Sequence, residues 1–203
     1  TTEIEKVKAM YYWVQQNIKY VAFEYELGGF IPRESNDIFN KKYGDCKDNS
    51  SLLQKMLEIA GIKSYLTWIG TNDLPYSYSK VPTPASDNHM ILTYFQDSIP
   101  FFLDATGRFN PIESPSTFIQ GKEALISIDS NTFLIKQVPI IDAKKNYVTD
   151  SIYLKIENLN LIGEGRVLMN NYSKMDYFNA LEGVKTKDDL LSFYNKNFEK
   201  GNN

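Results

Sequence analysis

The chain contains a single cysteine, Cys46, and a single histidine, His89, among its 203 residues. One thiol cannot form a disulfide within the chain, and structural zinc sites draw three or four ligands mainly from cysteine and histidine. Neither kind of cross-link can therefore hold this chain together. It has to fold by burying apolar side chains, and any cysteine chemistry has to use Cys46 with His89.

The composition suits such a core. Hydrophobic residues make up 42% of the chain, and a domain of this size buries roughly 70% of its unfolded surface. The net charge of −3 argues against a dedicated nucleic-acid-binding protein, which would carry a basic patch. No stretch approaches the ~20 apolar residues that span a bilayer. The chain starts without a methionine or a signal-peptide pattern, so we expect a piece of a longer multidomain protein.

Apolar spacing predicts two amphipathic helices in the first part of the chain. One covers residues 4–18, where Thr2 and Glu5 form a capping-box pattern at its start. The other covers residues 46–60, and Gly61 follows where a glycine commonly ends a helix. A shorter helical stretch is expected at residues 37–42.

The rest of the chain is predicted to form mainly strands and loops, so the expected fold class is α+β. Strands are expected at residues 64–71, 90–95, 99–103, 125–128 and 133–138, with long loops at 72–88 and 105–123. A hairpin of residues 147–157 and 161–169 and a helical stretch from about residue 174 follow. We expect a core domain at residues 1–140, and a C-terminal β-hairpin plus helix at residues 141–203 as part of a β-rich extension.

Cys46 lies at the predicted start of a helix, in the sequence Tyr43-Gly44-Asp45-Cys46-Lys47-Asp48. A helix N-terminus favours the thiolate over the thiol, and its N–H groups can hold an oxyanion. A free cysteine is more often a small buried hydrophobic residue. The charged neighbours Asp45, Lys47 and Asp48 argue against that alternative here.

His89 and Asp104 complete a possible catalytic set. His89 opens a predicted strand, where a lone histidine is more often a solvated loop-end residue. Asp104 ends the next strand, where an aspartate is usually a turn former. Two adjacent antiparallel strands would bring these two ends together, so Asp104 can orient the imidazole while His89 activates Cys46.

With these motifs the chain resembles the transglutaminase-like superfamily, specifically bacterial transglutaminase-core proteins described as cysteine proteases. The resemblance covers roughly residues 4–140 and rests on the segments at residues 13–20, 43–48, 88–89 and 103–106, with the helix at 52–62. It implies a papain-like or transglutaminase-like core in which the helix bearing Cys46 packs on an antiparallel sheet. It also implies that Cys46 is the nucleophile, His89 the general base and acid, and Asp104 the orienting residue.

The resemblance further implies an upstream oxyanion donor, for which Tyr20 and Tyr25 are candidates, and a periplasmic or other extracytoplasmic location. The expected activity is thiol-dependent acyl transfer or hydrolysis at protein or peptide amides, with either water or an amine as acceptor. The triad requires no cofactor and no metal, and the acidic pairs Asp45/Asp48 and Asp188/Asp189 are better explained as helix-capping charges.

Two other functions stay open at this point. A non-catalytic binding or scaffold module could keep the fold, and acetyl transfer from a thioester donor could use the same three residues. The tyrosine-rich segment at residues 76–78 could line a substrate cleft or be a solvated loop.

Overall fold

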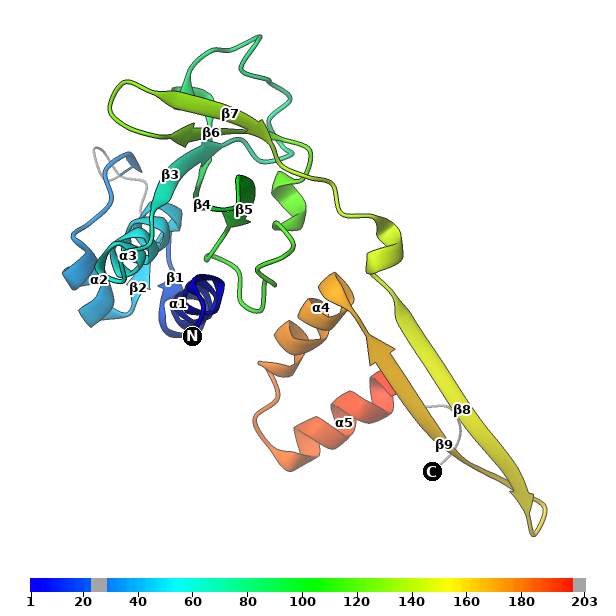
Figure 1. Cartoon of the computed structure of the whole chain (residues 1–203). Coiled ribbons are helices and arrows are strands. Elements are labelled where there is room, and N and C mark those ends of the chain that lie inside the picture. The colour runs from blue at the N-terminus through cyan, green and yellow to red at the C-terminus, as the bar shows by residue number, and fades with distance from the viewer. Residues whose placement is uncertain (23–28, 199–203) are drawn as a thin grey trace. The chain divides into compact units, whose positions relative to one another are not determined.

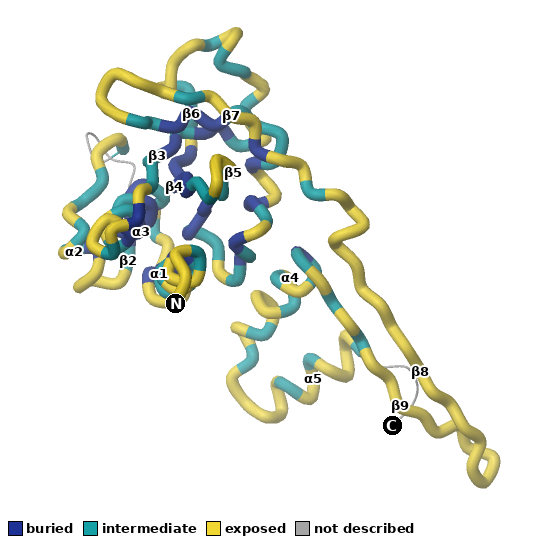
Figure 2. Tube along the Cα trace, viewed as in Figure 1, coloured by how far each residue is buried: buried dark blue, intermediate teal, exposed yellow. Residues whose placement is uncertain are grey.

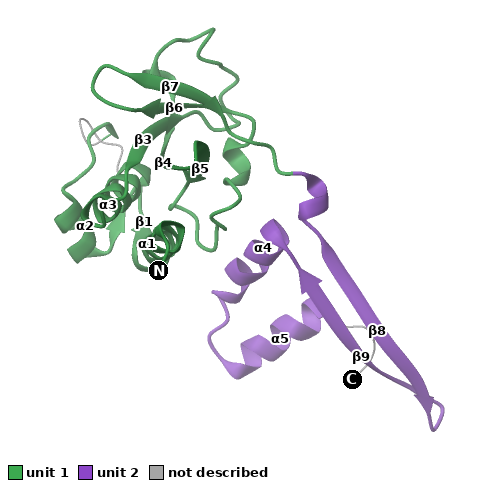
Figure 3. Cartoon of the chain, viewed as in Figure 1, with its two compact units in different colours: residues 1–141 green, residues 142–203 purple. Residues whose placement is uncertain are grey.

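The structure is a computed structural model that describes residues 1–22 and 29–198. It divides into two compact units, Thr1–Ile141 and Asp142–Asn203 (Figure 3). Whether these units are the two domains expected from the sequence stays a prediction. Among the described residues, no helix has both the length and the apolar character needed to cross a bilayer.

The first unit begins with the two helices that the apolar spacing predicts and the shorter helix expected at residues 37–42. They are α1 (Glu3–Asn17), α2 (Ser35–Lys41) and α3 (Cys46–Ile59). The capping box of Thr2 and Glu5 is present at the start of α1. Two short strands, β1 (Lys19–Tyr20) and β2 (Tyr43–Gly44), pair in parallel between these helices. The β1–β2 pair has no periodic pattern long enough for sequence to reveal it.

A five-stranded antiparallel sheet forms the other layer of this unit. It consists of β3 (Ser64–Ile69), β4 (His89–Gln96), β5 (Ile99–Leu103), β6 (Glu123–Ser127) and β7 (Phe133–Gln137), in the order β5-β4-β3-β6-β7. The strands expected at 64–71 and 125–128 are therefore shifted or shortened at their ends. Short 3-10 turns lie in the long loops, η2 at Pro84–Ser86 and η3 at Thr117–Ile119.

Apolar side chains gather on both faces of the sheet. One cluster joins α1 and α3 to the sheet through Val7, Leu53 and Leu92, among others. The second cluster contains Ile91, Ile119 and other buried residues of β3, β6 and the loop before β6. Buried residues concentrate in these layers (Figure 2). The expected α+β core, with the Cys46 helix packed on an antiparallel sheet, is confirmed (Figure 1).

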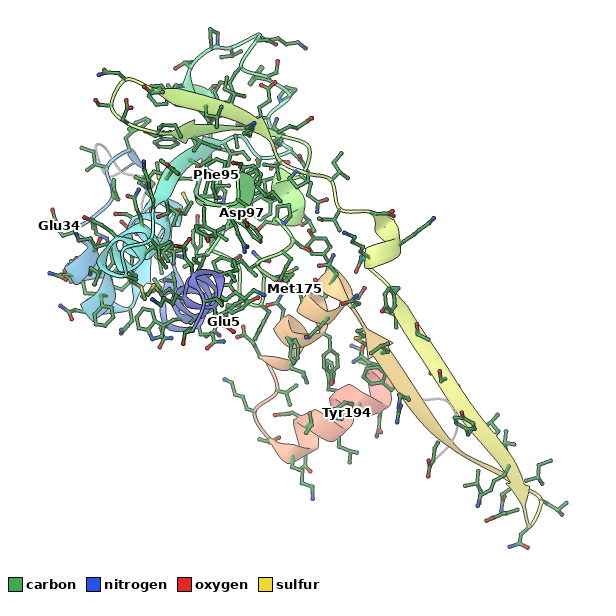
Figure 4. The ribbon with its side chains drawn as sticks, viewed as in Figure 1. Glu5, Glu34, Phe95, Asp97, Met175 and Tyr194 are labelled. Atoms are coloured by element: carbon green, nitrogen blue, oxygen red, sulfur yellow. The ribbon has the colours of Figure 1, made fainter. Side chains whose placement is uncertain are left out.

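The second unit contains a two-stranded ribbon and two helices. Strands β8 (Val148–Glu157) and β9 (Asn160–Met169) pair antiparallel, as the expected hairpin requires. The single helical stretch expected from residue 174 is instead two helices, α4 (Asn171–Leu181) and α5 (Lys187–Phe198). A capping pair at the start of α5 separates the two helices. Thr186 and Asp189 exchange side-chain-to-backbone hydrogen bonds of 3.1 Å each. Tyr194, labelled in Figure 4, bonds Tyr177 across this helix pair.

Candidate active site

Cys46 is the first residue of α3 and is partly exposed. Asp45 is the N-cap, and its carboxylate accepts hydrogen bonds from the N–H groups of Lys47 (2.9 Å) and Asp48 (3.1 Å). The Asp48 side chain bonds back to the Asp45 N–H, which completes a capping box. The expectation that Asp45 and Asp48 cap a helix is therefore confirmed, and the box fixes the turn that presents Cys46.

Cys46 is not a core residue, as its charged neighbours suggested, but those neighbours are themselves buried. Asp45, Lys47 and Asp48 are each 3% exposed or less. Each charge has a partner, because Lys47 forms an ion pair with Asp45 and Arg33 forms one with Asp48 at 2.8 Å. Burying a charge is tolerated only when it is paired and hydrogen-bonded. The sequence hides this pairing, since Arg33 lies 15 residues before Asp48.

Gly44 allows this turn to form. A Cβ atom at position 44 would lie 2.6 Å from Cβ and 3.0 Å from Oδ2 of Asp48. The N–H of Val21 also donates to the Gly44 carbonyl at 2.9 Å, which ties the segment before Cys46 to β1. The close approach of Asp48, and not an unusual backbone angle, requires glycine here.

His89 is the first residue of β4 and is 7% exposed, so the solvated histidine considered from sequence is wrong. Its Nε2 lies 3.1 Å from Oδ2 of Asp104. The Cys46 side chain lies near enough to the ring to raise the pKa of His89. Since Nε2 faces Asp104, Nδ1 is the nitrogen left for the thiol. The structure thus brings Cys46, His89 and Asp104 together in that order.

Among the described residues, four hydrogen bonds hold the Asp104 carboxylate. Oδ2 accepts from His89 and from the Ser116 hydroxyl at 2.7 Å, and Oδ1 accepts from the N–H (3.1 Å) and hydroxyl (2.6 Å) of Thr106. Asn110 in turn donates to the Ser116 hydroxyl at 2.8 Å. The carboxylate is 1% exposed, so this network fixes both its position and its rotamer.

The charges of His89 and Asp104 support each other. Burial lowers the pKa of His89, but the negative Asp104, its hydrogen bond and the neighbouring Cys46 together raise that pKa to about 10. Burial raises the pKa of Asp104, whereas His89, Thr106 and Ser116 lower it to about 2. At neutral pH the pair is therefore an imidazolium and a carboxylate.

Sequence reasoning missed three residues of this site. Ser116 and Thr106 bond Asp104, and the Phe118 ring packs edge-on against His89 at 5.3 Å between ring centroids. All three come from the loop between β5 and β6. Thr106 lies two residues after Asp104, where an Asx turn is a local pattern that the sequence can suggest. No local pattern marks Ser116 or Phe118, so only the tertiary structure reveals their roles.

Of the two tyrosines expected as oxyanion donors, only one lies within the described residues. Tyr20 is 43% exposed and pairs with Gly44 in the β1–β2 ladder, two residues before Cys46. Tyr25 lies outside the described residues. The role of both stays a prediction.

The tyrosine-rich loop does line a hollow, with Tyr76, Tyr78, Asp87 and Glu123 in its wall. Its volume is about 10 Å³, which is roughly the space for one water molecule. Tyr78 fills part of this region by bonding Asp87 through its hydroxyl and Glu123 through its N–H. In the described parts of the chain, no three Cys, His, Asp or Glu side chains group as a metal site would require.

Residues 1–98 match the family model of the transglutaminase-like superfamily. The resemblance expected from the motifs is thereby confirmed for this segment, which contains Cys46 and His89 but ends before Asp104.

Two solved structures are similar to parts of the chain. One, described as a "putative protease" from Parabacteroides distasonis, is 17% identical over 77% of this chain, with a TM-score of 0.48. The other, described as a "putative cysteine protease" from Cytophaga hutchinsonii, is 19% identical over 51% of this chain, with a TM-score of 0.36. The matched part spans 31% of each of those chains. No curated protein matches this chain.

Proposed function

We propose that this protein is a cysteine enzyme that transfers or hydrolyses acyl groups of protein or peptide amides. The observation that carries the proposal is the hydrogen bond of 3.1 Å between the His89 imidazole and the Asp104 carboxylate, with Cys46 near enough to raise the pKa of the same ring. The match of residues 1–98 to the transglutaminase-like superfamily supports the same class.

Acylation would use the charges of the resting site. Cys46 reacts as the thiolate, which is the nucleophilic form of a thiol, and the imidazolium of His89 holds the proton that the leaving group needs. The Cys46 Sγ attacks the amide carbonyl carbon and forms a C–S bond. His89 then gives its proton to the departing nitrogen, the C–N bond breaks, and an amine leaves while a thioester remains.

Deacylation would reverse the role of His89. The neutral imidazole takes a proton from water or from an amine as that acceptor attacks the thioester carbon. The C–S bond breaks, and the product is a carboxylic acid with water or a new amide with an amine. Asp104 stabilises the imidazolium in both halves and keeps Nε2 as the nitrogen that faces it.

The oxyanion would bind at the first turn of α3. The Asp45 carboxylate already takes the N–H groups of Lys47 and Asp48. Within the described residues, the Cys46 N–H has no acceptor and is the main-chain donor that remains in this turn. Losing one oxyanion donor typically costs about 10²–10³-fold in kcat. A fall of that order in Tyr20→Phe would assign Tyr20 as the second donor, and an unchanged rate would exclude it.

Alkylation of the single thiol tests the activated nucleophile. We expect iodoacetamide to label Cys46 at pH 6 faster than free cysteine, and we expect His89→Ala to lose this advantage. Equal rates for wild type and free cysteine would contradict the catalytic proposal and favour a binding module that keeps the fold.

The acceptor requires a second measurement. Mass spectrometry of Cys46 after incubation with a glutamine-peptide library, with and without a primary amine, would trap the thioester donor. A carboxylic acid product in the presence of the amine identifies a hydrolase, and an amine adduct identifies a transglutaminase. Adduct formation from acetyl-CoA alone would favour acetyl transfer instead.

A further inference from the structure

Phe118 lies directly against the base of the proposed triad while much of its side chain stays exposed. Its ring meets the His89 ring edge to face, with 5.3 Å between centroids and 70° between planes. Phe118 is 41% exposed, whereas His89 is 7% exposed. Phe118 therefore covers one side of the imidazole and leaves apolar surface open beside it.

The turn that carries Phe118 is anchored by its neighbours. Ser116 is buried and donates to Asp104 at 2.7 Å. Ile119 is fully buried in the cluster that contains Ile91. Since Ile91 is two residues from His89, both side chains lie on the same face of β4, so burial of Ile119 brings residue 118 to His89. The turn thus has a polar and an apolar anchor without the Phe118 ring.

A second loop fixes the backbone of the same turn. The N–H of Asn72 donates to the Phe118 carbonyl at 2.8 Å, and the Asn72 side chain donates to the Thr117 carbonyl at 3.3 Å. Next to Asn72, the side chain of Asn88 accepts from the Thr71 N–H and donates to the Thr71 hydroxyl, each at 2.9 Å. Asn88 directly precedes His89. The ring and the base are therefore positioned by one set of hydrogen bonds before any ligand arrives.

Single exposed apolar residues are common on protein surfaces. Phe118 differs because it touches a proposed catalytic group and because other residues supply the anchors of its turn. An apolar substrate group packed on the Phe118 ring would bury apolar surface that is exposed in the free protein, and this burial is favourable. A polar residue at position 118 would suit a solvent-facing turn equally well and offer no such gain.

We propose that Phe118 is a substrate-binding residue that selects amides with an apolar side chain next to the carbonyl that Cys46 attacks. This inference rests on the proposed function, since it assigns the substrate class of the same site. The ring lies against His89, the group that must give its proton to the departing amine in the proposed reaction. Substrates with aromatic or aliphatic side chains at that position are preferred over glycine.

A pair of thiol-directed reagents tests the preference without a known substrate. N-acetyl-phenylalanine chloromethyl ketone and N-acetyl-glycine chloromethyl ketone both alkylate a thiolate with loss of chloride. The measurement is the rate of Cys46 modification by intact-protein mass spectrometry, with glutathione giving the intrinsic reactivity ratio of the two reagents. We expect wild type to favour the phenylalanine reagent by about 10-fold beyond that ratio.

The variants separate binding from positioning. Phe118→Ala is expected to bring the ratio to within about twofold of glutathione's, because the rate with the phenylalanine reagent falls more than the rates with the glycine reagent and iodoacetamide. Phe118→Leu should give an intermediate ratio. Phe133→Ala is the matched control, because Phe133 is 53% exposed at the start of β7. That control should keep the wild-type ratio. If circular dichroism shows Phe118→Ala unfolded, Phe118→Leu decides.

Three results would overturn the inference. In the first, wild type shows the same ratio of phenylalanine-reagent to glycine-reagent rates as glutathione. In the second, Phe118→Ala keeps the wild-type preference. In the third, the rates with both chloromethyl ketones and with iodoacetamide fall equally in Phe118→Ala. The last result would make Phe118 a positioning residue for His89. Failure of the proposed function has a different signature, because iodoacetamide would then label wild-type Cys46 no faster than free cysteine.

Discussion

A single histidine makes the electrostatics of this site directly measurable. His89 gives the only histidine ring signal that the chain can produce, so an NMR titration of its Cε1–H needs no assignment. We expect a folded-state pKa near 10 in wild type. Asp104→Asn and Cys46→Ala should each lower it, because each removes a partner of the imidazolium. A wild-type pKa near 6.5, the ordinary value for histidine, would contradict the ion pair.

The same shift fixes the sign of a stability change with pH. The folded pKa of His89 lies above the unfolded value of about 6.5. Its contribution to the free energy of unfolding is therefore present in full below about pH 6.5 and is lost as the pH rises towards 10. Urea denaturation between pH 6 and 10 should show wild type losing more stability than His89→Gln. Parallel curves would argue against the raised pKa.

Ser116 should contribute to stability through Asp104. Ser116→Ala removes one of the bonds to a buried carboxylate, and bonds to charged groups are worth about 1.5–3 kcal/mol. The midpoint of urea denaturation at pH 7 should fall accordingly. Ser114→Ala, in the same loop and without a side-chain bond to Asp104, is the control and should change the free energy of unfolding little.

At the scale of secondary-structure elements, the sequence predicts the segments that have a regular spacing of apolar residues and a residue that marks a helix end. Helices α1 and α3 were predictable because Thr2 and Gly61 mark an end of each and apolar residues recur along one face. The chain order of Cys46, His89 and Asp104 also carried information, since adjacent antiparallel strands bring the last two together. Ser116, Phe118 and the Arg33–Asp48 pair were not predictable, because their partners lie far along the chain and no local pattern marks them.

The first turn of α3 is sensitive to one atom. In Gly44→Ala, the added Cβ would lie 2.6 Å from the Asp48 Cβ, and overpacking of this kind typically costs about 1–3 kcal/mol. We expect a lower thermal midpoint and slower alkylation of Cys46, because the capping box must shift. Gly70→Ala is the control, since its nearest neighbours lie at 3.4 Å, an ordinary contact. Equal melting of the two variants would contradict this account.

The β8–β9 ribbon should be the least protected sheet of the described chain. Both strands are exposed along most of their length, and a two-stranded hairpin alone is marginally stable. We expect its amides to exchange with deuterium faster than those of β3 and β4, where strand β4 is buried at six of its eight residues. Slow exchange in the ribbon would indicate that another surface covers it.

At the scale of the whole molecule, every residue of the proposed site lies in the first unit. Residues 1–141 contain both apolar clusters and the hydrogen bonds of Asp104. We therefore expect this fragment, expressed alone, to melt cooperatively and to keep the iodoacetamide reactivity of Cys46. Loss of either property would show that residues 142–203 are needed for the core and would contradict the domain division expected from the sequence.

The turn between β4 and β5 sets the geometry of the site from a distance. It is a two-residue turn of Asp97 and Ser98, both with positive φ, and Asp97 is labelled in Figure 4. This turn fixes the register of β4 against β5, and that register places Asp104 beside His89. His89 itself lies eight residues before Asp97 in the chain. A register change of two residues would move the carboxylate by about 7 Å while every apolar side chain kept its face. Surface turns usually accept insertions and deletions. A change of length in this turn would leave the sheet folded but would separate Asp104 from His89.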